Sequence, residues 1–415
     1  MSRLLNINNY HYRRGGAEAV YLDHGALFAN DGWDIDWFSM RHPQNLPGTD
    51  ETYFADLIDL EYMQGKVSKA KSAAAIIYNG NARSRLHALI GAARPDVAHL
   101  HNIYHHLSPS ILGALKAHDI PAVLTAHDLK LVCPSYKMLS GGKVCERCKG
   151  GKLWNVAVHR CMKGSMALSS LIAVESTVHR LAGLYRNAVD RVVAPSRFYR
   201  DKLIEWGWDA DKVIYIPNFV RARPRRAPVK LDGAVLYFGR LSEEKGLATL
   251  IRAAAMTGVA VNIAGTGPCD QEFRALAQNL NAPVTFLGYR TGAALEQLLD
   301  DARAIVLPSE WYENAPMSVI EAYNAGRPVL GADIGGIPEM IDNGVTGWTF
   351  PSRDVEALAS KLEEISATPV ANLEAMGRAG GMMVAEHLSA ARYYERMSDV
   401  YRQLGVAKST TWRHS

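Results

Sequence analysis

Two glutamates that lie eight positions apart, Glu313 and Glu321, stand out in the stretch WYENAPMSVIEA (311–322). Apolar residues flank Glu321 in what reads as a helix, so this carboxylate would lie on a face that the chain otherwise buries. A carboxylate is tolerable there when a pair of hydroxyl groups or a cation satisfies it. Pro316 fits the first helical turn, where N–H groups have no partner within the helix. The pattern predicts a ligand site at this helix, with an ion pair between Glu321 and a structural arginine as the alternative.

Two cations follow a predicted strand in the stretch AVLYFGRLSEEKGL (234–247). Gly239 and Arg240 end the strand, and Lys245 begins the next helix. An arginine can fork onto phosphate oxygens and a lysine supplies a point charge, so the two together at the mouth of a sheet suit a diphosphate. The alternative is that both are ordinary solvated residues of the surface.

Glycine pairs open two further helices. Gly15 and Gly16 do so near the N-terminus, and Gly265 and Gly267 do so in the stretch IAGTGP. Such turns let the backbone approach a ligand and present helix N–H groups to an anion, although a plain tight turn has the same residues. The second turn is not the dinucleotide fingerprint, because Asp270 occupies the third glycine position. This departure counts against a nicotinamide enzyme.

The stretch AIVLPSEWYENAPMSVIEAYNAGRPVLGADIGGIPEMI (304–341) resembles the C-terminal signature of the retaining GT-B glycosyltransferases of glycosyltransferase family 4. Other motifs fall in the order of that family: GGAE near the N-terminus, VAPSRF (193–198), IPN, FGRLSEEKG (238–246), AGTGP (264–268) and GGIPEMIDNGVTGW (335–348). The resemblance covers nearly the whole chain. It implies the fold class α/β, GT-B, in which two doubly wound Rossmann-like domains face a central cleft.

The resemblance also assigns roles to the glutamate pair. It implies that Glu321 accepts hydrogen bonds from the ribose hydroxyls of the nucleotide and that Glu313 lies near the donor sugar. The helix start between them would turn its free N–H groups toward the diphosphate. This start comprises Asn314, Ala315, Pro316, Met317 and Ser318. Together with the cations and glycines above, these residues form the predicted donor site. Many members of the family have EGFG where this chain has ENAP, which bears on which sugar fits.

A histidine at the end of a strand is implied in the same way. His127, in TAHD, stands where members of the family often have a histidine that reaches the donor sugar or its phosphate. His101, in HLHN, ends the neighbouring strand and is predicted to lie on the acceptor side. A hydrogen-bonded structural role is the alternative for either histidine. The predicted catalytic residues are His127, Glu313, Arg240 and Lys245.

The implied reaction moves a sugar from a nucleoside diphosphate sugar, with UDP or GDP, to a hydroxyl of a glycan or lipid-linked glycan in cell-surface polysaccharide biosynthesis. The resemblance implies retention of the anomeric configuration and catalysis without a metal or another cofactor. Positive charge must therefore meet the leaving diphosphate, and Arg240, Lys245 and helix starts can supply it. The Asp-x-Asp of Asp34 and Asp36 lies within an early predicted strand and is discounted as a metal site.

Strand-like apolar runs alternate with helix-length segments, which is typical of parallel sheets covered on both faces. The first half has predicted strands at 3–8, 34–40, 96–101, 121–127 and 191–196. The second half has them at 234–240, 259–265, 284–288, 304–309, 328–332 and 348–350. The predicted parts are an N-terminal acceptor-binding domain (1–216), a Pro- and Arg-rich linker (217–233), a C-terminal domain for the nucleotide sugar (234–390), and a helix and tail (391–415) that packs back on the first domain.

Four of the five cysteines lie in an insert of the first domain at 133–161. They are Cys133, Cys145, Cys148 and Cys161. Their spacing, C-x11-C-x2-C-x12-C, fits a structural zinc site, with His159 as a substitute ligand. An unliganded loop and an iron–sulfur or redox role are the alternatives.

Composition and charge fit a cytoplasmic enzyme. Hydrophobic residues make up 48% of the chain, no apolar run is long enough to span a bilayer, and the N-terminus lacks the pattern of a signal peptide. Residues 62–200 contain 20 Lys and Arg against 6 Asp and Glu, although the whole chain carries a net charge of only +4. A solvated basic face explains this, and so does an anionic partner. The basic segment 63–94 favours an amphipathic helix on an anionic membrane, so peripheral binding to the inner face of the plasma membrane is kept as a hypothesis.

Two other functions stay open. A nucleotide-sugar epimerase or hydrolase of the same fold would use the same donor site, and supplying the donor without an acceptor would distinguish it. A nucleic-acid-binding protein could use the cysteine insert and the basic face. No platform of interleaved aromatic and basic residues supports that second reading, so nucleic acid is not expected as a partner.

Overall fold

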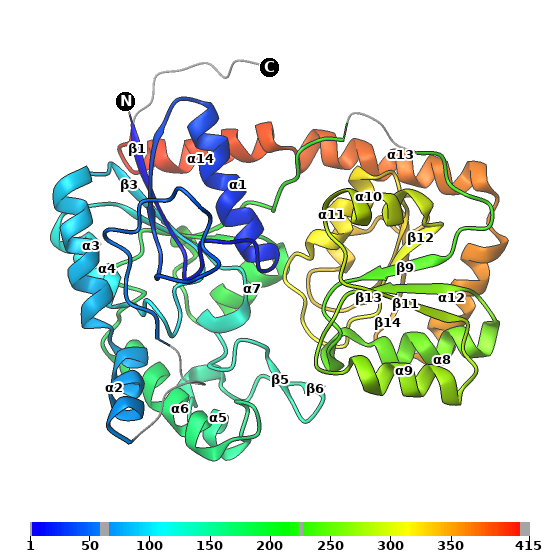
Figure 1. Cartoon of the computed structure of the whole chain (residues 1–415), viewed down its shortest axis with the longest axis horizontal. Helices are drawn as coiled ribbons and strands as arrows, with labels where there is room; N and C mark the ends of the chain where they lie inside the picture. Colours follow the sequence, from blue (N-terminus) through cyan, green and yellow to red (C-terminus); the bar gives the residue numbers. More distant parts are fainter. Residues whose placement is uncertain (1, 59–65, 224–226, 407–415) are drawn as a thin grey trace. The chain divides into compact units, whose positions relative to one another are not determined.

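The computed structural model describes residues 2–58, 66–223 and 227–406 of the 415-residue chain. Its contacts divide the chain into two compact units. Unit 1 comprises Met1–Lys137, Glu146–Ile216 and Tyr394–Ser415, and unit 2 comprises Met138–Cys145 and Pro217–Tyr393. Figure 1 shows that each unit is built on a sheet with helices on both of its faces.

Unit 1 contains a six-stranded sheet in the order β2-β1-β3-β4-β7-β8, and every neighbouring pair in it is parallel. Its strands are β1 (Arg3–Ile7), β2 (Asp34–Phe38), β3 (Val97–Leu100), β4 (Ala122–Thr125), β7 (Arg191–Ala194) and β8 (Val213–Tyr215). Strands β3 and β4 are buried at every position, as expected for central strands covered by helices on both faces.

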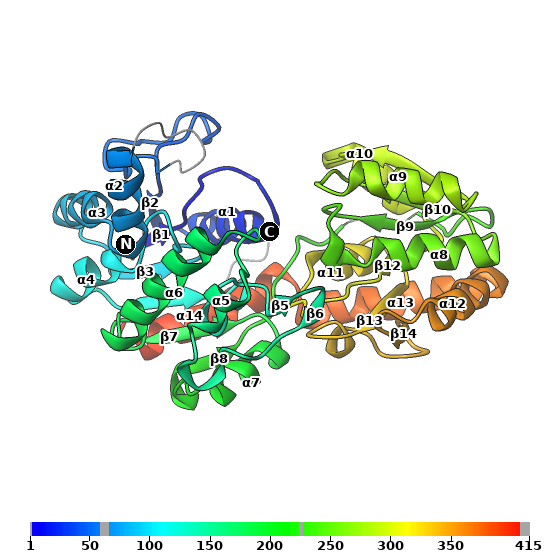
Figure 2. The same cartoon turned by 90° about the horizontal axis from the view of Figure 1, so that it is seen from below.

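Helices connect these strands and cover the sheet (Figure 2). They are α1 (Gly16–Asn30), α2 (Lys66–Ile77), α3 (Gly80–Ala93), α4 (Ser110–Ala117), α5 (Asn155–Val158), α6 (Met166–Leu181) and α7 (Arg197–Glu205), with α14 (Ala390–Gln403) at the end of the chain. Short 3-10 turns lie at η1 (Leu129–Leu131), η2 (Lys149–Gly151) and η3 (Ala210–Lys212). Side-chain caps define several starts: the oxygens of Asn79, Ser165 and Ser196 accept from the N–H groups three residues on.

Unit 2 contains a second parallel sheet, in the order β11-β10-β9-β12-β13-β14. Its strands are β9 (Val235–Phe238), β10 (Val261–Ala264), β11 (Val284–Gly288), β12 (Ala304–Leu307), β13 (Val329–Asp333) and β14 (Gly347–Pro351). Its helices are α8 (Leu247–Thr257), α9 (Asp270–Asn279), α10 (Gly292–Asp301), α11 (Met317–Asn324), α12 (Val355–Ala367) and α13 (Val370–His387), with 3-10 turns η4 (Glu243–Lys245) and η5 (Pro338–Met340).

Alternate residues of the unit 2 strands point into two different cores. Val306 packs with α8, α9 and α12 on one face of the sheet, whereas Ile305 and Leu307 pack with α11 and α13 on the other. Both faces are therefore apolar, which explains why β12 reads in the sequence as an unbroken apolar run instead of an alternating one. The two cores hold the strands in place, and the loops that follow the strand ends contain the candidate site.

The doubly wound class predicted from the sequence is confirmed, and each predicted strand overlaps an observed one. Three strands were not predicted: β8, which has three residues, and the antiparallel pair β5 (Leu139–Ser140) and β6 (Lys143–Val144). The chain from 138 to 145 was predicted in the N-terminal domain, but its contacts group it with unit 2. The stretch 217–233 also belongs to unit 2 where it is described, instead of standing apart as a linker.

The C-terminal helix begins at Ala390 and joins unit 1 from Tyr394 onward. The hydroxyl of Tyr401 contacts His99 Nδ1 at 2.6 Å and His24 Nε2 at 3.0 Å, so α14 packs on α1 and β3. The predicted tail from 407 onward lies outside the described residues. Among the helices that are described, none is both long enough and apolar enough to cross a membrane.

Candidate active site

The strand order of unit 2 reverses between β9 and β12, because the chain builds outward from β9 in one direction and from β12 in the other. Ligands of doubly wound sheets bind at such switch points, beyond the carboxyl ends of the strands. Gly239 and Arg240 follow β9, and Ser309 to Glu313 follow β12. The two stretches that were predicted to hold a donor therefore lie at the position where topology favours a ligand.

A buried ion pair joins those two stretches. The ammonium of Lys245, in η4, lies 2.7 Å from Oε1 of Glu313, and the hydroxyl of Ser309 donates to the same oxygen over 2.7 Å. Burial alone would raise the pKa of Glu313, but the charge and hydrogen bond of Lys245 outweigh it, so this pKa lies below its ordinary value. The Lys245 ammonium also lies 5.1 Å from the ring centroid of Trp311. Glu313 is therefore held as a carboxylate with a fixed orientation.

The backbone of Glu313 is fixed from a third loop, which follows β13. The N–H of Gly336 donates to the Glu313 carbonyl over 2.8 Å. Gly335 has a φ of +61°, and a Cβ at this position would come within 2.4 Å of the Glu313 carbonyl oxygen. Only glycine permits this approach. The GG of the GGIPEM motif thus supports Glu313 directly, a role that the sequence alone did not reveal.

The loops after β9 and β10 are locked together. Leu241 donates its N–H to the carbonyl of Thr266 over 3.0 Å, and its own carbonyl accepts from Cys269 N–H over 3.1 Å. Gly267 makes this possible, because a Cβ there would come within 2.1 Å of the Leu241 carbonyl oxygen. The locked loops fix the backbone of Arg240, whose carbonyl accepts from the Tyr237 hydroxyl over 2.9 Å. The Arg240 side chain is exposed and makes no ion pair among the residues that the structure describes.

Helix α11 begins at Met317, with Pro316 as its N-cap residue in an extended conformation, so the predicted first turn (314–318) was placed about three residues too early. The side-chain amide of Asn218 donates to the carbonyl of Ala315 over 3.1 Å and so fixes the helix start. Glu321 lies one turn into the helix, is partly exposed, and has a pKa raised by burial. Within the described part of the chain its carboxylate has no hydrogen-bond or ion-pair partner, so no structural arginine occupies it. The carboxylate of Glu321 can therefore accept hydrogen bonds from a ligand.

Unit 1 has its own switch point, between β1 and β3. His101 follows β3, and His127 follows the neighbouring β4. Nδ1 of His101 lies 2.8 Å from Nε2 of His127, and the two rings stack with centroids 5.1 Å apart. Burial lowers the pKa of His127 to about 3 and the pKa of His101 well below its usual value. Both rings are therefore neutral near pH 7, and one donates to the other.

His101 differs from His127 in its exposure. It was expected on the acceptor side, but its side chain is completely buried in unit 1, whereas His127 is partly exposed. His101 therefore orients His127 through the hydrogen bond instead of meeting an acceptor at the surface of the unit. Two further histidines continue the cluster, since His99 stacks on His101 with centroids 4.8 Å apart and His24 lies against His99.

The glycines near the N-terminus lie between the end of β1 and the start of α1. Gly15 precedes the helix and Gly16 is its first residue, as predicted. Glu18, in the first turn, is 8% exposed and was not singled out from the sequence. Burial raises its pKa, although Arg14 and the side chain of Asn8 act in the opposite direction. This buried acid at the start of α1 is a further candidate for ligand contact.

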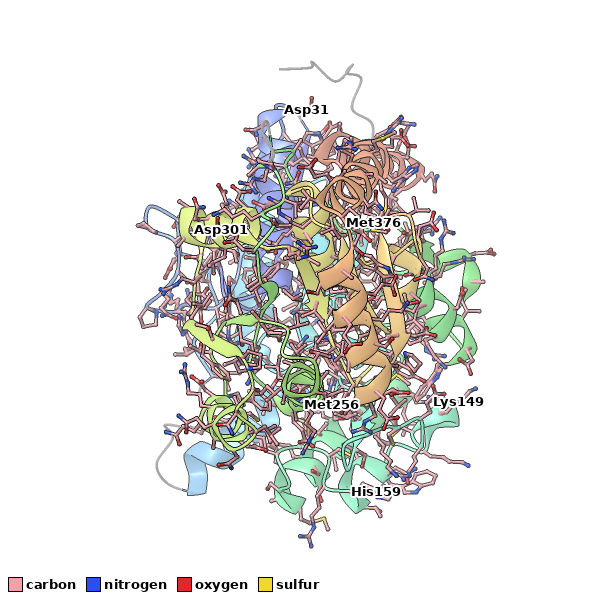
Figure 3. The ribbon with its side chains drawn as sticks, turned by 90° about the vertical axis from the view of Figure 1, so that its right-hand side faces the viewer. Asp31, Lys149, His159, Met256, Asp301 and Met376 are labelled. Carbon is pink, nitrogen blue, oxygen red and sulfur yellow. The ribbon has the colours of Figure 1, made fainter. Side chains whose placement is uncertain are left out.

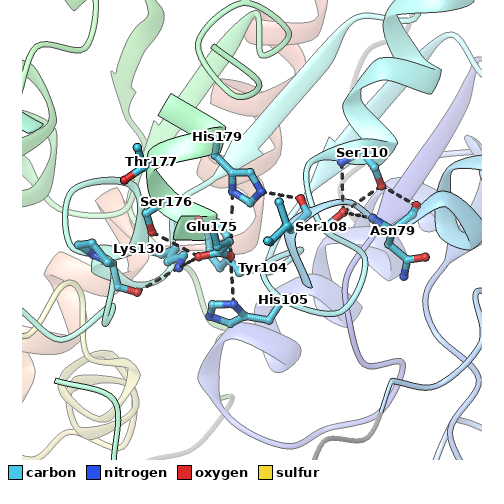
Figure 4. Close-up of polar contacts among 12 residues, drawn as sticks. Asn79, Tyr104, His105, Ser108, Ser110, Lys130, Glu175, Ser176, Thr177 and His179 are labelled. Atoms are coloured by element: carbon cyan, nitrogen blue, oxygen red, sulfur yellow. Dashed lines mark hydrogen bonds and ion pairs between the residues drawn. The ribbon is translucent and has the colours of Figure 1, made fainter. Parts of the chain in front are cut away.

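A second buried ion pair supports the loop that follows His127 (Figure 4). Lys130 donates to Glu175 Oε2 over 2.7 Å and to the carbonyl of Pro134 over 3.0 Å, and His105 Nδ1 lies 3.1 Å from Glu175 Oε1. Burial by itself would raise the pKa of Glu175, but Lys130 and His105 bring it down to about 2. Sequence reasoning missed this network, because its partners are 45 residues apart and no motif joins them.

Comparison with known proteins gives the family. The model of Glycosyltransferase Family 4 matches residues 14–223, and the model of Glycosyl transferases group 1 matches residues 222–381. The chain belongs to glycosyltransferase family 4. The first of these two models alone spans just over half of the chain, and the two together leave only the ends unmatched.

Relatives and solved structures agree with this family. The chain is 31% identical over 191 residues to the amylovoran biosynthesis glycosyltransferase AmsK of Erwinia amylovora (41% of this chain, 46% of AmsK), and 31% identical over 216 residues to a glycogen synthase of Mycobacterium tuberculosis (48% and 51%). The matched stretch thus spans about half the length of each relative. Sucrose-phosphate synthase from Thermosynechococcus elongatus has the same fold, with a TM-score of 0.73, 20% identity, and coverage of 98% of this chain and 100% of that one. HepE of Anabaena, solved with UDP and glucose, has a TM-score of 0.68 and 16% identity over 97% and 100%. The GT-B fold is confirmed.

For this family member, the structure distributes the predicted residues over both units. Unit 2 holds Gly239, Arg240, Lys245, Gly265, Gly267, Glu313, Asn314, Ala315, Pro316, Met317, Ser318 and Glu321, and unit 1 holds Gly15, Gly16, His101 and His127. Asp34 and Asp36 both pair with Arg3, which fits a structural role in β2.

The contacts of the chain assign the four cysteines of the insert to different units. Cys145 belongs to unit 2, whereas Cys133, Cys148 and Cys161 belong to unit 1. All five cysteines are described, and none forms a disulfide. Cys133 contacts the Ser135 hydroxyl at 3.2 Å. Within the described ranges, no three His, Cys, Asp or Glu side chains lie together as a set that could hold a metal. A structural zinc site therefore stays a prediction.

Proposed function

We propose that this protein is a retaining glycosyltransferase that moves a sugar from a nucleoside diphosphate sugar to a hydroxyl of a glycan or lipid-linked glycan during polysaccharide biosynthesis. One observation carries the proposal: the Lys245–Glu313 pair at the switch point of unit 2, between the glycine loops after β9 and β10 and the start of α11. AmsK, by its name an amylovoran biosynthesis glycosyltransferase, and HepE, solved with UDP and glucose, support the substrate class.

Breaking the bond between the anomeric carbon and the diphosphate oxygen leaves negative charge on the diphosphate. Arg240, with an exposed and uncommitted guanidinium, and Lys245 stabilise that charge, together with the N–H groups at the start of α11. These protein groups can do so without a metal ion, so catalysis is proposed to be metal-independent. The uncommitted carboxylate of Glu321 accepts hydrogen bonds from the ribose hydroxyls.

Glu313 is proposed to contact the donor sugar. Lys245 and Ser309 both donate to Oε1, which fixes the orientation of the carboxylate, and Oε2 is proposed to accept a hydrogen bond from a sugar hydroxyl. The departing diphosphate oxygen takes the proton of the acceptor hydroxyl, and the new bond forms on the face that the diphosphate leaves, which retains the anomeric configuration. His127, kept neutral by burial, can donate a hydrogen bond to the donor without adding a charge.

Calorimetric titration of UDP and GDP tests the donor site and identifies the base. One of the two should bind, and Arg240→Ala, Lys245→Ala and Glu321→Ala should each weaken binding about tenfold or more. Arg252→Ala is the matched control, because Arg252 is an exposed arginine of α8 away from the strand ends. Absence of binding by both nucleotides, or equal losses in the control, would refute the proposal.

Product analysis tests the chemistry. With donor and acceptor present, proton NMR should show an α-linkage from an α-configured donor, and addition of EDTA should leave the rate unchanged. With donor alone, hydrolysis and epimerisation should be slow. Fast consumption of the donor without acceptor would instead favour the epimerase or hydrolase.

A further inference from the structure

The outward face of helix α6 is apolar. Val174, Val178 and Leu181, at spacings of four and three residues, have exposed fractions of 52%, 41% and 83%. The opposite face is buried and mixed: Ile172 packs in a cluster with Ile76 and Val156, while Ser169, Glu175 and His179 are polar. A helix at the surface of a globular unit normally turns its polar and charged residues toward water, and α6 departs from that pattern.

The charges of α6 do not lie on this outward face. Its one acidic residue, Glu175, is fully buried in the ion pair with Lys130, and His179 is 5% exposed. Arg180 is the exposed cation of the helix and packs over the backbone of Gly151. The outward face therefore presents aliphatic side chains to water over about two helical turns, which is typical of a surface that binds a partner.

Exposed apolar side chains also lie at the neighbouring helix α5 and at the start of α6. Trp154 and Val158 are 59% and 63% exposed, and Met166, at the start of α6, is 47% exposed. Helices α5 and α6 pack directly on each other, and Figure 2 shows them side by side. We call Trp154, Val158, Met166, Val174, Val178 and Leu181 the α5–α6 surface.

Three exposed cations lie within or next to α5 and α6. Lys152, Arg160 and Arg180 are exposed, and none of them makes an ion pair among the described residues. The nearby Glu146 is committed to Lys202 at 2.7 Å. This local excess agrees with the 20 cationic against 6 acidic residues of the segment 62–200.

We propose that the α5–α6 surface docks unit 1 on an anionic lipid bilayer. Tryptophan and aliphatic side chains enter the interface between headgroups and acyl chains, while lysine and arginine meet lipid phosphates, and this surface offers both in one place. A second copy of this chain fits less well, because a symmetric contact would bring Lys152, Arg160 and Arg180 against their own copies. The proposal does not rest on the proposed function, although it would bring the enzyme close to a lipid-linked acceptor.

The structure also moves the membrane hypothesis to a different segment. The basic stretch 63–94 forms α2 and α3 in its described part, with residues 63–65 outside the described ranges. The buried side of α3, with Leu86, Leu89 and Ile90, already packs in unit 1. The solvent-exposed apolar side chains described above lie instead at α5 and α6.

Flotation of the full chain with vesicles tests the proposal. Vesicles of phosphatidylcholine with about one third phosphatidylglycerol should carry the protein, whereas pure phosphatidylcholine should carry much less, and added salt should weaken binding. Trp154→Gln/Val178→Gln/Leu181→Gln should lower partition about tenfold or more, because exposed apolar side chains are removed and a good helix former is kept. Lys152→Glu/Arg160→Glu should lower it about tenfold, and only for anionic vesicles.

Two matched controls separate the surface from general effects. Met256→Gln replaces a 62% exposed side chain of α8, labelled in Figure 3, and Met382→Gln replaces a 61% exposed one of α13. Neither should change flotation. Equal recovery on both kinds of vesicle, or an unchanged partition of the triple variant, would overturn the proposal. So would a change from dimer to monomer on sedimentation of the triple variant, since the surface would then join two copies. Nucleotide titration of each variant reports on the donor site separately.

Discussion

The ammonium of Lys245 lies 2.7 Å from the carboxylate of Glu313, although the two residues are 68 positions apart and Glu313 is 7% exposed. The pair closes the loop after β9 against the loop after β12, on either side of the switch point of unit 2. A site that binds a diphosphate needs at least one cation that is not already paired with a carboxylate of the protein. Lys245 is partly neutralised by Glu313, and the second cation, Arg240, has no such partner among the described residues.

This pair should show strong energetic coupling. Lys245→Met leaves a buried carboxylate without its cation, and Glu313→Gln leaves the ammonium without its anion, so each change should lower the free energy of unfolding by about 2 kcal/mol. The double variant should cost clearly less than the sum, because it leaves no uncompensated charge. Hydrogen exchange of peptides from β9 and β12 at rising denaturant measures the local free energies. Additive costs would show that the two side chains do not interact in solution.

Gly267 should tolerate no side chain. Gly267→Ala would place a Cβ within 2.1 Å of the Leu241 carbonyl oxygen, so the loops after β9 and β10 must separate. We expect a loss of about 2 kcal/mol or more, seen as a lower thermal midpoint by calorimetry, and weaker nucleotide binding.

Gly91→Ala is the matched control for this change. Gly91 lies within α3 and has no positive φ, and apart from its chain neighbours and the backbone of its own helix no atom lies within 4 Å of the position that a Cβ would occupy. Alanine is the better helix former, so this variant should gain up to about 1 kcal/mol. A midpoint for Gly267→Ala that equals the wild-type value would contradict the close approach of the two loops.

Most of the strands and of the candidate residues in unit 2 could be predicted from patterns within short stretches of the sequence. The strands of both sheets are short apolar runs bounded by turn residues, and the candidate residues of unit 2 lie in the loops that directly follow those runs. Pro316 likewise indicated that a helix starts near it, and α11 begins at the next residue. Strand β8 was not predicted because its three residues, Val213–Tyr215, are too few to show the periodicity of a strand.

Features that depend on contacts far apart in the sequence could not be predicted. Whether His101 faces a ligand or a neighbouring ring is decided by the packing of His99 and His24, which come from β3 and from α1. The partner of Lys130 is Glu175, on a helix that follows the cysteine insert. The support of Glu313 by Gly335 likewise depends on the adjacency of β12 and β13.

The Glu175–Lys130 pair should be essential for the stability of unit 1. Glu175→Gln would leave the Lys130 ammonium, whose side chain is 5% exposed, without its counter-charge, at a cost of about 3 kcal/mol. Lys130→Met/Glu175→Gln should recover part of this loss. Ser176→Ala is the control, because Ser176 donates only a long hydrogen bond of 3.3 Å to Glu175 and should cost less than about 1 kcal/mol. Urea unfolding followed by limited proteolysis measures the difference, and equal costs for Glu175→Gln and Ser176→Ala would contradict the buried pair.

The buried histidines should make unit 1 sensitive to mild acid. Burial lowers the pKa of His24 and of His127 to about 3, while an unfolded histidine keeps its ordinary value of 6.5. Below pH 6.5 the unfolded chain therefore binds protons that the folded chain does not, so stability is complete above pH 6.5 and falls as the pH decreases toward 3. Each such histidine contributes up to about 1.4 kcal/mol per pH unit to the pH dependence of the free energy of unfolding.

His24→Gln keeps a polar partner for the Tyr401 hydroxyl and should reduce this slope by about 1 kcal/mol per pH unit. Hydrogen exchange of α1 and α14 peptides measures the slope, above about pH 5, where Glu175 is still ionised. His159→Gln removes a histidine that is exposed to water and should leave the slope unchanged, so an equal effect of the two variants would show that burial is not the cause.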